Sequence, residues 1–115
     1  METNTPYKIG GNVINNGLIP NLPAEACVEV PCLVDGSGVT PCHVGNLPEQ
    51  CAALNRACIN VQLLTILAAK TRRKDYIYQA AMMDPHLQSE LSIDDIVALC
   101  DAMIEAHAGW LPAYT

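Results

Sequence analysis

A long and almost uncharged stretch, residues 47 to 69, constrains the fold of this chain more than any other part of the sequence. Its apolar residues recur at the three-and-four spacing that lines up on one face of a helix. Those residues are Leu47, Cys51, Leu54, Cys58, Val61, Leu64 and Ala68. Arg56 is the only charged residue between Glu49 and Lys70. A helix that is apolar over most of its circumference is buried by its neighbours, so the stretch predicts a central helix with Leu54 and Val61 in the core.

The residues on either side predict strands before this helix and helices after it. Alternating side chains and turn residues indicate strands at about 11–15, 26–34 and 39–44. Helical spacing indicates helices at about 48–69, 75–83 and 93–107. The predicted fold class is therefore α+β, in which a short antiparallel β-meander packs on a long central helix and two shorter helices complete one domain of 115 residues.

Four local signals refine this prediction. Pro31 cannot donate to a ladder of hydrogen bonds, so it predicts an edge strand or a bulge. The Asp84-Pro85 pair ends the second helix, and Ser92 followed by Asp95 resembles a capping box at the start of the third. The run from Trp110 to Pro112 is predicted to fold back as an apolar clasp.

The charge balance excludes several classes of partner. A formal net charge of −6 argues against nucleic acid and anionic membrane, because both require a basic patch. The one basic cluster, residues 72–74, is either a phosphate clamp or, as we favour, a solvated turn between helices.

Asn55, Arg56 and Asn60 argue against a membrane span in the long helix. No basic start followed by an apolar run precedes it, so we expect a cytoplasmic protein without a signal peptide.

The six cysteines do not form a recognisable metal or disulfide pattern. They lie at positions 27, 32, 42, 51, 58 and 100, without a C-x-x-C pair. Cys51, Cys58 and Cys100 fall on predicted apolar helix faces, where a free thiol behaves as a small hydrophobic group. A zinc site with Cys42 and His43 is an alternative, although its spacing matches no known ligand template.

The candidate chemical groups also have structural explanations. Asp84 and His86 form either an acid–base pair or, as we favour, a helix stop whose side chains cap the backbone. Asp94 and Asp95 suit the start of a helix, and His107 is either a cation at the end of that helix or a packed ring. Glu29 requires a partner if it points inward, but it does not if its face of the sheet meets water. From these residue types and spacings, we therefore assign no catalytic, cofactor-binding or metal-binding residue.

One long segment resembles a known family. Residues 11–48, GNVINNGLIPNLPAEACVEVPCLVDGSGVTPCHVGNLP, are similar to the C-terminal meander of family 4 glycoside hydrolases. The α-galactosidase (melibiase) branch is resembled further by AALNRACINVQLLT at 52–65, YQAAMMDPH at 78–86 and AHAGWLP at 106–112. The resemblance covers the chain from about residue 2 to 112. It implies a fold of the type shared by the C-terminal domains of lactate dehydrogenase and family 4 glycosidases.

The resemblance also implies an activity that this chain does not carry by itself. In the family, bound NAD transiently oxidises the sugar, a Tyr base removes the acidified proton, and a divalent manganese ion stabilises the enolate. The NAD-binding turn, the metal ligands and that Tyr lie upstream of the region seen here, so the N-terminal NAD-binding domain is absent and no site residue is carried over. We expect the isolated chain to bind neither NAD nor Mn²⁺ and to be inactive.

Three hypotheses of function follow. In the first, the chain is the C-terminal domain or a fragment of an α-galactosidase-like enzyme, whose sugar substrate concerns only the full-length protein. In the second, it is a stand-alone, non-catalytic module for assembly or binding. In the third, it is a Cys/His metal protein. We expect a homo-oligomer or a missing N-terminal half as partner, because a domain cut from a larger enzyme exposes apolar surface.

Overall fold

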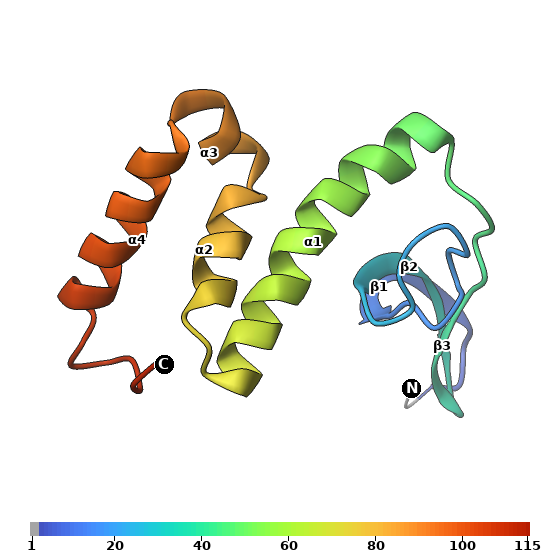
Figure 1. The fold of residues 1–115 in the computed structure, drawn as a ribbon. Coiled ribbons are helices and arrows are strands. Elements are labelled where there is room, and N and C mark those ends of the chain that lie inside the picture. Colours follow the sequence, from blue (N-terminus) through green and yellow to red (C-terminus); the bar gives the residue numbers. More distant parts are fainter. Residues whose placement is uncertain (1–2) are drawn as a thin grey trace. The chain divides into compact units, whose positions relative to one another are not determined.

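Three strands pair in the order in which they occur along the chain. In the computed structural model, which describes residues 3–115, β1 (Tyr7–Ile14) pairs antiparallel with β2 (Cys27–Asp35), and β2 pairs antiparallel with β3 (Gly38–Pro41). Figure 1 shows these strands in blue to teal, followed by helices in green to red. The α+β class predicted from the sequence is confirmed, with a three-stranded antiparallel sheet and four helices in the described residues. The chain divides into two compact units, and the division falls between Ala53 and Leu54.

The first strand is longer than its sequence indicates. The predicted start at residue 11 is wrong, because the pairing with β2 begins at Tyr7, opposite Val34. Gly10 and Gly11 weaken the strand signal in the sequence, yet the neighbouring strand requires Gly11. A Cβ atom on that residue would lie 2.7 Å from the Sγ atom of Cys32. The missing side chain therefore makes room for a cysteine that is fully buried.

Pro31 lies in the central strand, so its predicted place on an edge strand or at a bulge is wrong. β2 is hydrogen-bonded on both sides, and the carbonyl of Pro31 accepts a hydrogen bond from the backbone N–H of Cys42 at 2.8 Å. Cys42 directly follows β3, whose last paired residue is Pro41. The donor that proline lacks would therefore point just beyond the end of the ladder, where its absence breaks no strand pairing.

One face of β2 carries the core of the first unit. Val28, Val30 and Cys32 alternate with exposed residues along the strand, as the two-residue period of a strand requires. The loop between β1 and β2 supplies further buried side chains, Ile19, Leu22 and Ala26.

The long helix is confirmed, but the prediction of its buried face is wrong in part. α1 spans Glu49–Thr71, with Pro48 directly before it. Ala68 is 3% exposed, whereas Leu54, predicted to be a core residue, is 73% exposed. Val61 is half-buried, and Cys58 is exposed.

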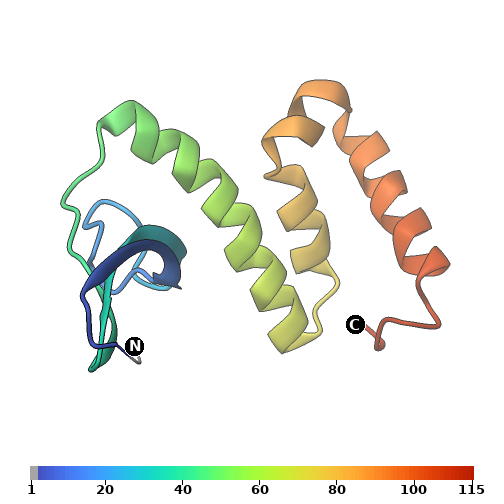
Figure 2. The same ribbon diagram turned by 180° about the vertical axis from the view of Figure 1, so that it is seen from behind.

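Three shorter helices follow where the sequence predicts two. They are α2 (Asp75–Met82), α3 (Pro85–Glu90) and α4 (Ile93–Ala106), and α2 lies between α1 and α4 in the views of Figures 1 and 2. Pro85 does end the preceding helix, but it also begins the six-residue α3. Ser92 caps α4, because its Oγ atom accepts a hydrogen bond from the N–H of Asp95 at 3.2 Å.

The buried contacts of α4 are made by two residues on one stripe. Ile96 and Cys100 are 2% and 6% exposed, and α4 packs against α2. Burial raises the pKa of the Cys100 thiol, which keeps it neutral. The prediction that Cys100 acts as a small hydrophobic group is therefore confirmed, whereas Cys51 and Cys58 are exposed.

Within the described residues, α1 is the one helix that is long and apolar enough, by length and composition, to cross a membrane. Core helices of soluble proteins share that length and composition, so this property by itself is weak support for a span.

Candidate functional site

The turn between α1 and α2 brings the basic cluster together with aromatic and acidic side chains. Arg73 donates to Asp75 from both Nε, at 3.1 Å from Oδ1, and a terminal guanidinium nitrogen. The same guanidinium lies 5.0 Å from the centre of the Tyr76 ring. The hydrogen bond from Arg73 holds the pKa of the Asp75 carboxyl below its usual value. This arrangement neutralises one of the three cations of the cluster.

Lys74 is neutralised in a similar way by α4. Its Nζ atom lies 3.0 Å from Oδ1 of Asp101 and 5.3 Å from the centre of the Tyr78 ring. The hydroxyl of Tyr78 donates a hydrogen bond to the same carboxylate. Two hydrogen bonds lower the pKa of Asp101, and the one from Tyr78 has a larger effect than the one from Lys74. Because two of the three cations are paired, the turn is a poor phosphate clamp, and the structure favours the predicted solvated turn.

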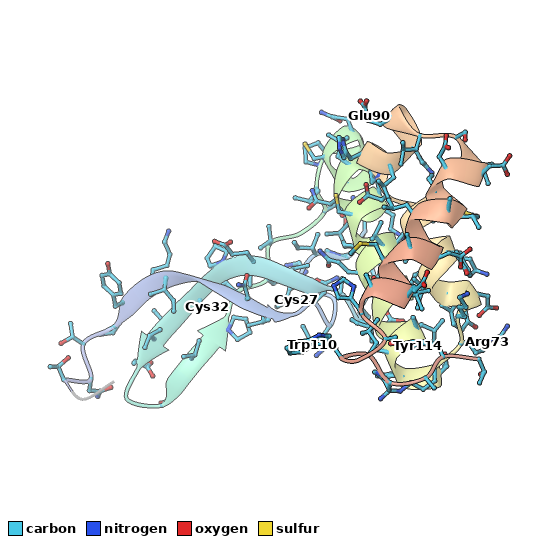
Figure 3. The ribbon with its side chains drawn as sticks, turned by 90° about the vertical axis from the view of Figure 1, so that its left-hand side faces the viewer. Cys27, Cys32, Arg73, Glu90, Trp110 and Tyr114 are labelled. Carbon is cyan, nitrogen blue, oxygen red and sulfur yellow. The ribbon has the colours of Figure 1, made fainter. Side chains whose placement is uncertain are left out.

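The chain folds back onto this turn, although not through the residues predicted. The backbone of Thr115 accepts a hydrogen bond from Lys74 N and donates one to Arg72 O, at 2.8 and 2.9 Å. The guanidinium of Arg72 lies 5.7 Å from the centre of the Tyr114 ring. Trp110 is 89% exposed, so the predicted apolar clasp at Trp110 to Pro112 is wrong. Figure 3 labels Arg73 and Tyr114 at the same end of the helices.

An apolar groove lies within the second unit. Its volume is about 360 Å³, and small side chains such as Ala68 and Ala80 line much of it. Tyr114 closes one part of the wall, and Asp84 and Thr65 are its polar lining residues. The hydroxyl of Thr65 donates to Val61 O, so this polar group is satisfied within its own helix. Such a groove suits an apolar side chain better than a polar ligand.

Asp84 and His86 do not form an acid–base pair. The Oδ1 atom of Asp84 accepts hydrogen bonds from the backbone N–H groups of His86 and Leu87, each at 3.0 Å. Asp84 therefore caps the start of α3, which confirms the structural explanation favoured from the sequence. His107 also acts at a helix end, because its Nδ1 atom lies 2.9 Å from Met103 O.

A site for a metal ion needs a group of ligands, and a dinucleotide site needs a glycine-rich turn after a strand. Within residues 3–115, no three His, Cys, Asp or Glu side chains are grouped so that they could hold a metal ion. Cys42 and His43 are exposed on the loop after β3, so the hypothesis of a zinc site is not supported by the geometry. The connection from β3 to α1 follows an antiparallel sheet, and Gly45 is its single glycine. The turn that binds a dinucleotide is instead rich in glycine and follows a strand of a parallel sheet.

Glu29 is exposed on the open face of β2, so it needs no buried partner. Its side chain lies over β1, where a Cβ atom on Gly10 would come within 2.7 Å of Glu29 Oε1. Cys27 and Cys32, labelled on β2 in Figure 3, differ in burial, since Cys27 is exposed and Cys32 is fully buried.

Asn15 was not singled out in the sequence, yet it is the one fully buried polar residue among those described. Its Nδ2 atom donates to the carbonyls of Ile19, Leu22 and Pro23 at 2.9–3.1 Å. Its Oδ1 atom accepts from Ile19 N at 2.7 Å. The position of Asn15 inside the segment 11–48 that resembles the family was the one signal that could have indicated it.

The comparisons with known proteins agree on one family. The pattern that defines the family 4 glycosyl hydrolase C-terminal domain matches residues 1–87. The α-galactosidase of Bacillus subtilis is 59% identical over 114 residues, which are 99% of this chain and 26% of that protein. The α-galactosidase of Rhizobium meliloti is 38% identical over 99% of this chain and 23% of its own length. The chain therefore spans about a quarter of these relatives.

Solved structures of related enzymes share the fold. A 6-phospho-α-glucosidase from gut microorganisms, in complex with NAD and glucose-6-phosphate, is 29% identical, with a TM-score of 0.87 over 99% of this chain and 25% of that one. The 6-phospho-β-glucosidase of Thermotoga maritima, with manganese, NAD⁺ and glucose-6-phosphate, is 26% identical, with a TM-score of 0.81 over 97% of this chain and 27% of that one. From its sequence and its fold, the chain belongs to the family 4 glycosyl hydrolases, in which it forms a C-terminal domain.

Proposed function

We propose that this domain serves an enzyme that hydrolyses α-galactosides. The observation that carries the proposal is the 59% identity to an α-galactosidase across nearly the whole chain. The identity to a 6-phospho-α-glucosidase with the same fold is 29%. An α-galactoside is therefore a better candidate substrate for the whole protein than a sugar phosphate.

In this proposal, NAD and Mn²⁺ bind to the part of the protein that lies upstream of this domain. Related solved structures hold both groups, whereas the described residues of this chain group no metal ligands and form no dinucleotide turn. The domain would contribute packing and subunit contacts to the active site. The enzyme would work in the cytoplasm, where NAD is available.

Partners of the domain follow from its exposed apolar side chains. Leu54 and Trp110 are each more than half exposed, and large exposed apolar side chains favour association with a partner that covers them. The partner is the upstream part of the same enzyme, and a homo-oligomer of the complete enzyme is compatible with the same surface.

The proposal can be tested with an exchange chimaera. The matching quarter of the Bacillus subtilis α-galactosidase is replaced by this chain, and hydrolysis of a nitrophenyl α-galactoside is measured with NAD, manganese and a reductant. We expect turnover by the chimaera, no turnover by the isolated chain, and no hydrolysis of a nitrophenyl 6-phospho-α-glucoside. A folded but inactive chimaera would support the alternative, a stand-alone module. Turnover or NAD binding by the isolated chain would contradict the proposal directly.

A further inference from the structure

One face of α1 changes from buried to exposed along its length. Leu54, Cys58, Val61, Thr65 and Ala68 follow at intervals of four, three, four and three residues, which keeps them on one side of the helix. Ala68 at one end is 3% exposed, Thr65 is exposed at the groove and Val61 is half-buried, whereas Cys58 and Leu54 at the other end are both exposed, Leu54 by 73%. The spacing of these residues is the same along the whole helix, so the two ends differ only in how far neighbouring segments bury them.

The difference arises from the lengths of the helices. α1 has 23 residues and α2 has 8, which correspond to about 34 Å and about 12 Å at the rise of an α-helix. The apolar groove that α2 and α3 form with this face reaches Val61 and Thr65. Leu54 and Cys58 extend the same face beyond the groove, where α2 provides no cover.

The uncovered part of the face is also uncharged. Arg56 is the one charged residue between Glu49 and Lys70, and it points away from this face, with its Nε atom 3.0 Å from Oδ1 of Asn60. A regular apolar spacing without charge fits the apolar stripe of another helix, which would continue the packing that α2 begins.

The partner that would cover this face of α1 is indicated by the share of its relatives that this chain spans. That share is about a quarter, so about three quarters of each relative could cover this face. We propose that Leu54, Cys58, Val61 and Thr65 form the docking face for an apolar helix from the upstream part of the family 4 enzyme. This inference rests on the proposed function, because it assigns a surface to the partner that the function requires.

The test compares the same substitution in two settings. Leu54→Glu is introduced into the isolated chain and into the exchange chimaera, with Ile93→Glu, at a residue that is 67% exposed on α4, as the matched control. We expect Leu54→Glu to leave the Tm of the isolated chain unchanged and to lower both the Tm and the activity of the chimaera. Ile93→Glu should leave both proteins near their original values.

A second measurement does not depend on a substitution. Cys58 is exposed, so a maleimide should label it readily in the isolated chain. Docking of an apolar helix should slow this labelling by about tenfold or more in the chimaera, because the thiol then reacts only when the face opens. The labelled peptide is identified by mass spectrometry.

The outcomes separate the two proposals. An active chimaera in which Leu54→Glu acts like Ile93→Glu, or in which Cys58 labels as fast as in the isolated chain, would overturn the docking face and leave the proposed function intact. Self-association of the isolated chain that Leu54→Glu abolishes would assign the face to a second copy and would also overturn it. An inactive chimaera contradicts the proposed function, and the docking face then fails with it.

Discussion

The side chain of Asn21 holds the backbone of Leu47 through both of its polar atoms. Nδ2 of Asn21 donates to Leu47 O at 2.9 Å, and its Oδ1 accepts from Leu47 N at 3.0 Å. The two residues are 26 positions apart, and Leu47 lies two residues before α1 begins. The loop after β1 is thereby tied to the segment that leads into the long helix.

Replacement of Asn21 should therefore loosen this segment. In Asn21→Ala, the Leu47 N–H loses its acceptor, so we expect its hydrogen exchange to become faster by about fivefold, since a hydrogen bond contributes on the order of 1 kcal/mol. Asn21→Asp keeps an acceptor but turns a second carboxylate oxygen towards the Leu47 carbonyl, so it should not restore the original rate. An unchanged exchange rate in both variants would show that the contact does not hold the segment.

Asn15, which directly follows β1, should contribute much more to stability than Asn12 within that strand. It is fully buried, and its side chain makes four hydrogen bonds to the loop. Asn15→Ala leaves buried carbonyls without a donor, so we expect a loss of roughly 2–4 kcal/mol in the free energy of unfolding. Asn12→Ala, on the exposed side of β1, should cost about 0.5 kcal/mol or less. Urea unfolding of the two variants tests this difference, and similar losses would contradict it.

The two large aliphatic residues Leu54 and Ile96 should respond very differently to truncation. Leu54 is 73% exposed and Ile96 is 2% exposed. In the isolated chain, Leu54→Ala should cost less than about 1 kcal/mol, whereas Ile96→Ala should cost roughly 2–5 kcal/mol, because it leaves a cavity between α4 and its neighbours. Denaturant titration followed by helical circular dichroism measures both. Equal costs would mean that Leu54 is covered in solution.

The contact of Asp101 with Tyr78 and Lys74 should make stability depend on acid pH. The pKa of Asp101 is lower in the folded chain than in the unfolded chain. The ionised carboxylate therefore stabilises the fold at a pH above the ordinary carboxyl pKa of about 3.9. This stabilisation is lost as the pH falls from there towards the lowered pKa of the folded chain. The group is exposed, so the effect is modest and screened by salt. We expect the Tm of the original chain to fall more steeply below about pH 5 than that of Asp101→Asn. The same comparison at high salt serves as control, because screening should reduce the difference between the two proteins.

The sequence predicts elements better than it predicts their surroundings. Apolar spacing and Pro48 located α1 to within two residues at each end. They could not show how far α2 covers it, because the length of a neighbouring helix leaves no trace in the spacing of α1. The packing of the sheet on the long helix, and the organisation of the chain as one domain, stay predictions.

Residues with a local role were also predicted better than residues with distant partners. The capping roles of Asp84 and Ser92 follow from their immediate neighbours, and both are present in the structure. Asn15 was missed because its partners are backbone carbonyls of a loop, which no residue type identifies. The start of β1 was missed because two glycines hide a strand signal, although one of them accommodates Cys32.

The fold-back of the chain end should depend on Tyr114 rather than on Trp110. Trp110 is 89% exposed, so Trp110→Ala should change stability by no more than about 0.5 kcal/mol. Tyr114→Ala removes the ring that faces Arg72 and part of the groove wall, so it should lower the Tm clearly. Because Trp110 is the single tryptophan, its fluorescence gives an independent check. Acrylamide should quench it in the folded chain nearly as strongly as in urea, whereas protection of the indole in the folded chain would show that the apolar clasp forms after all.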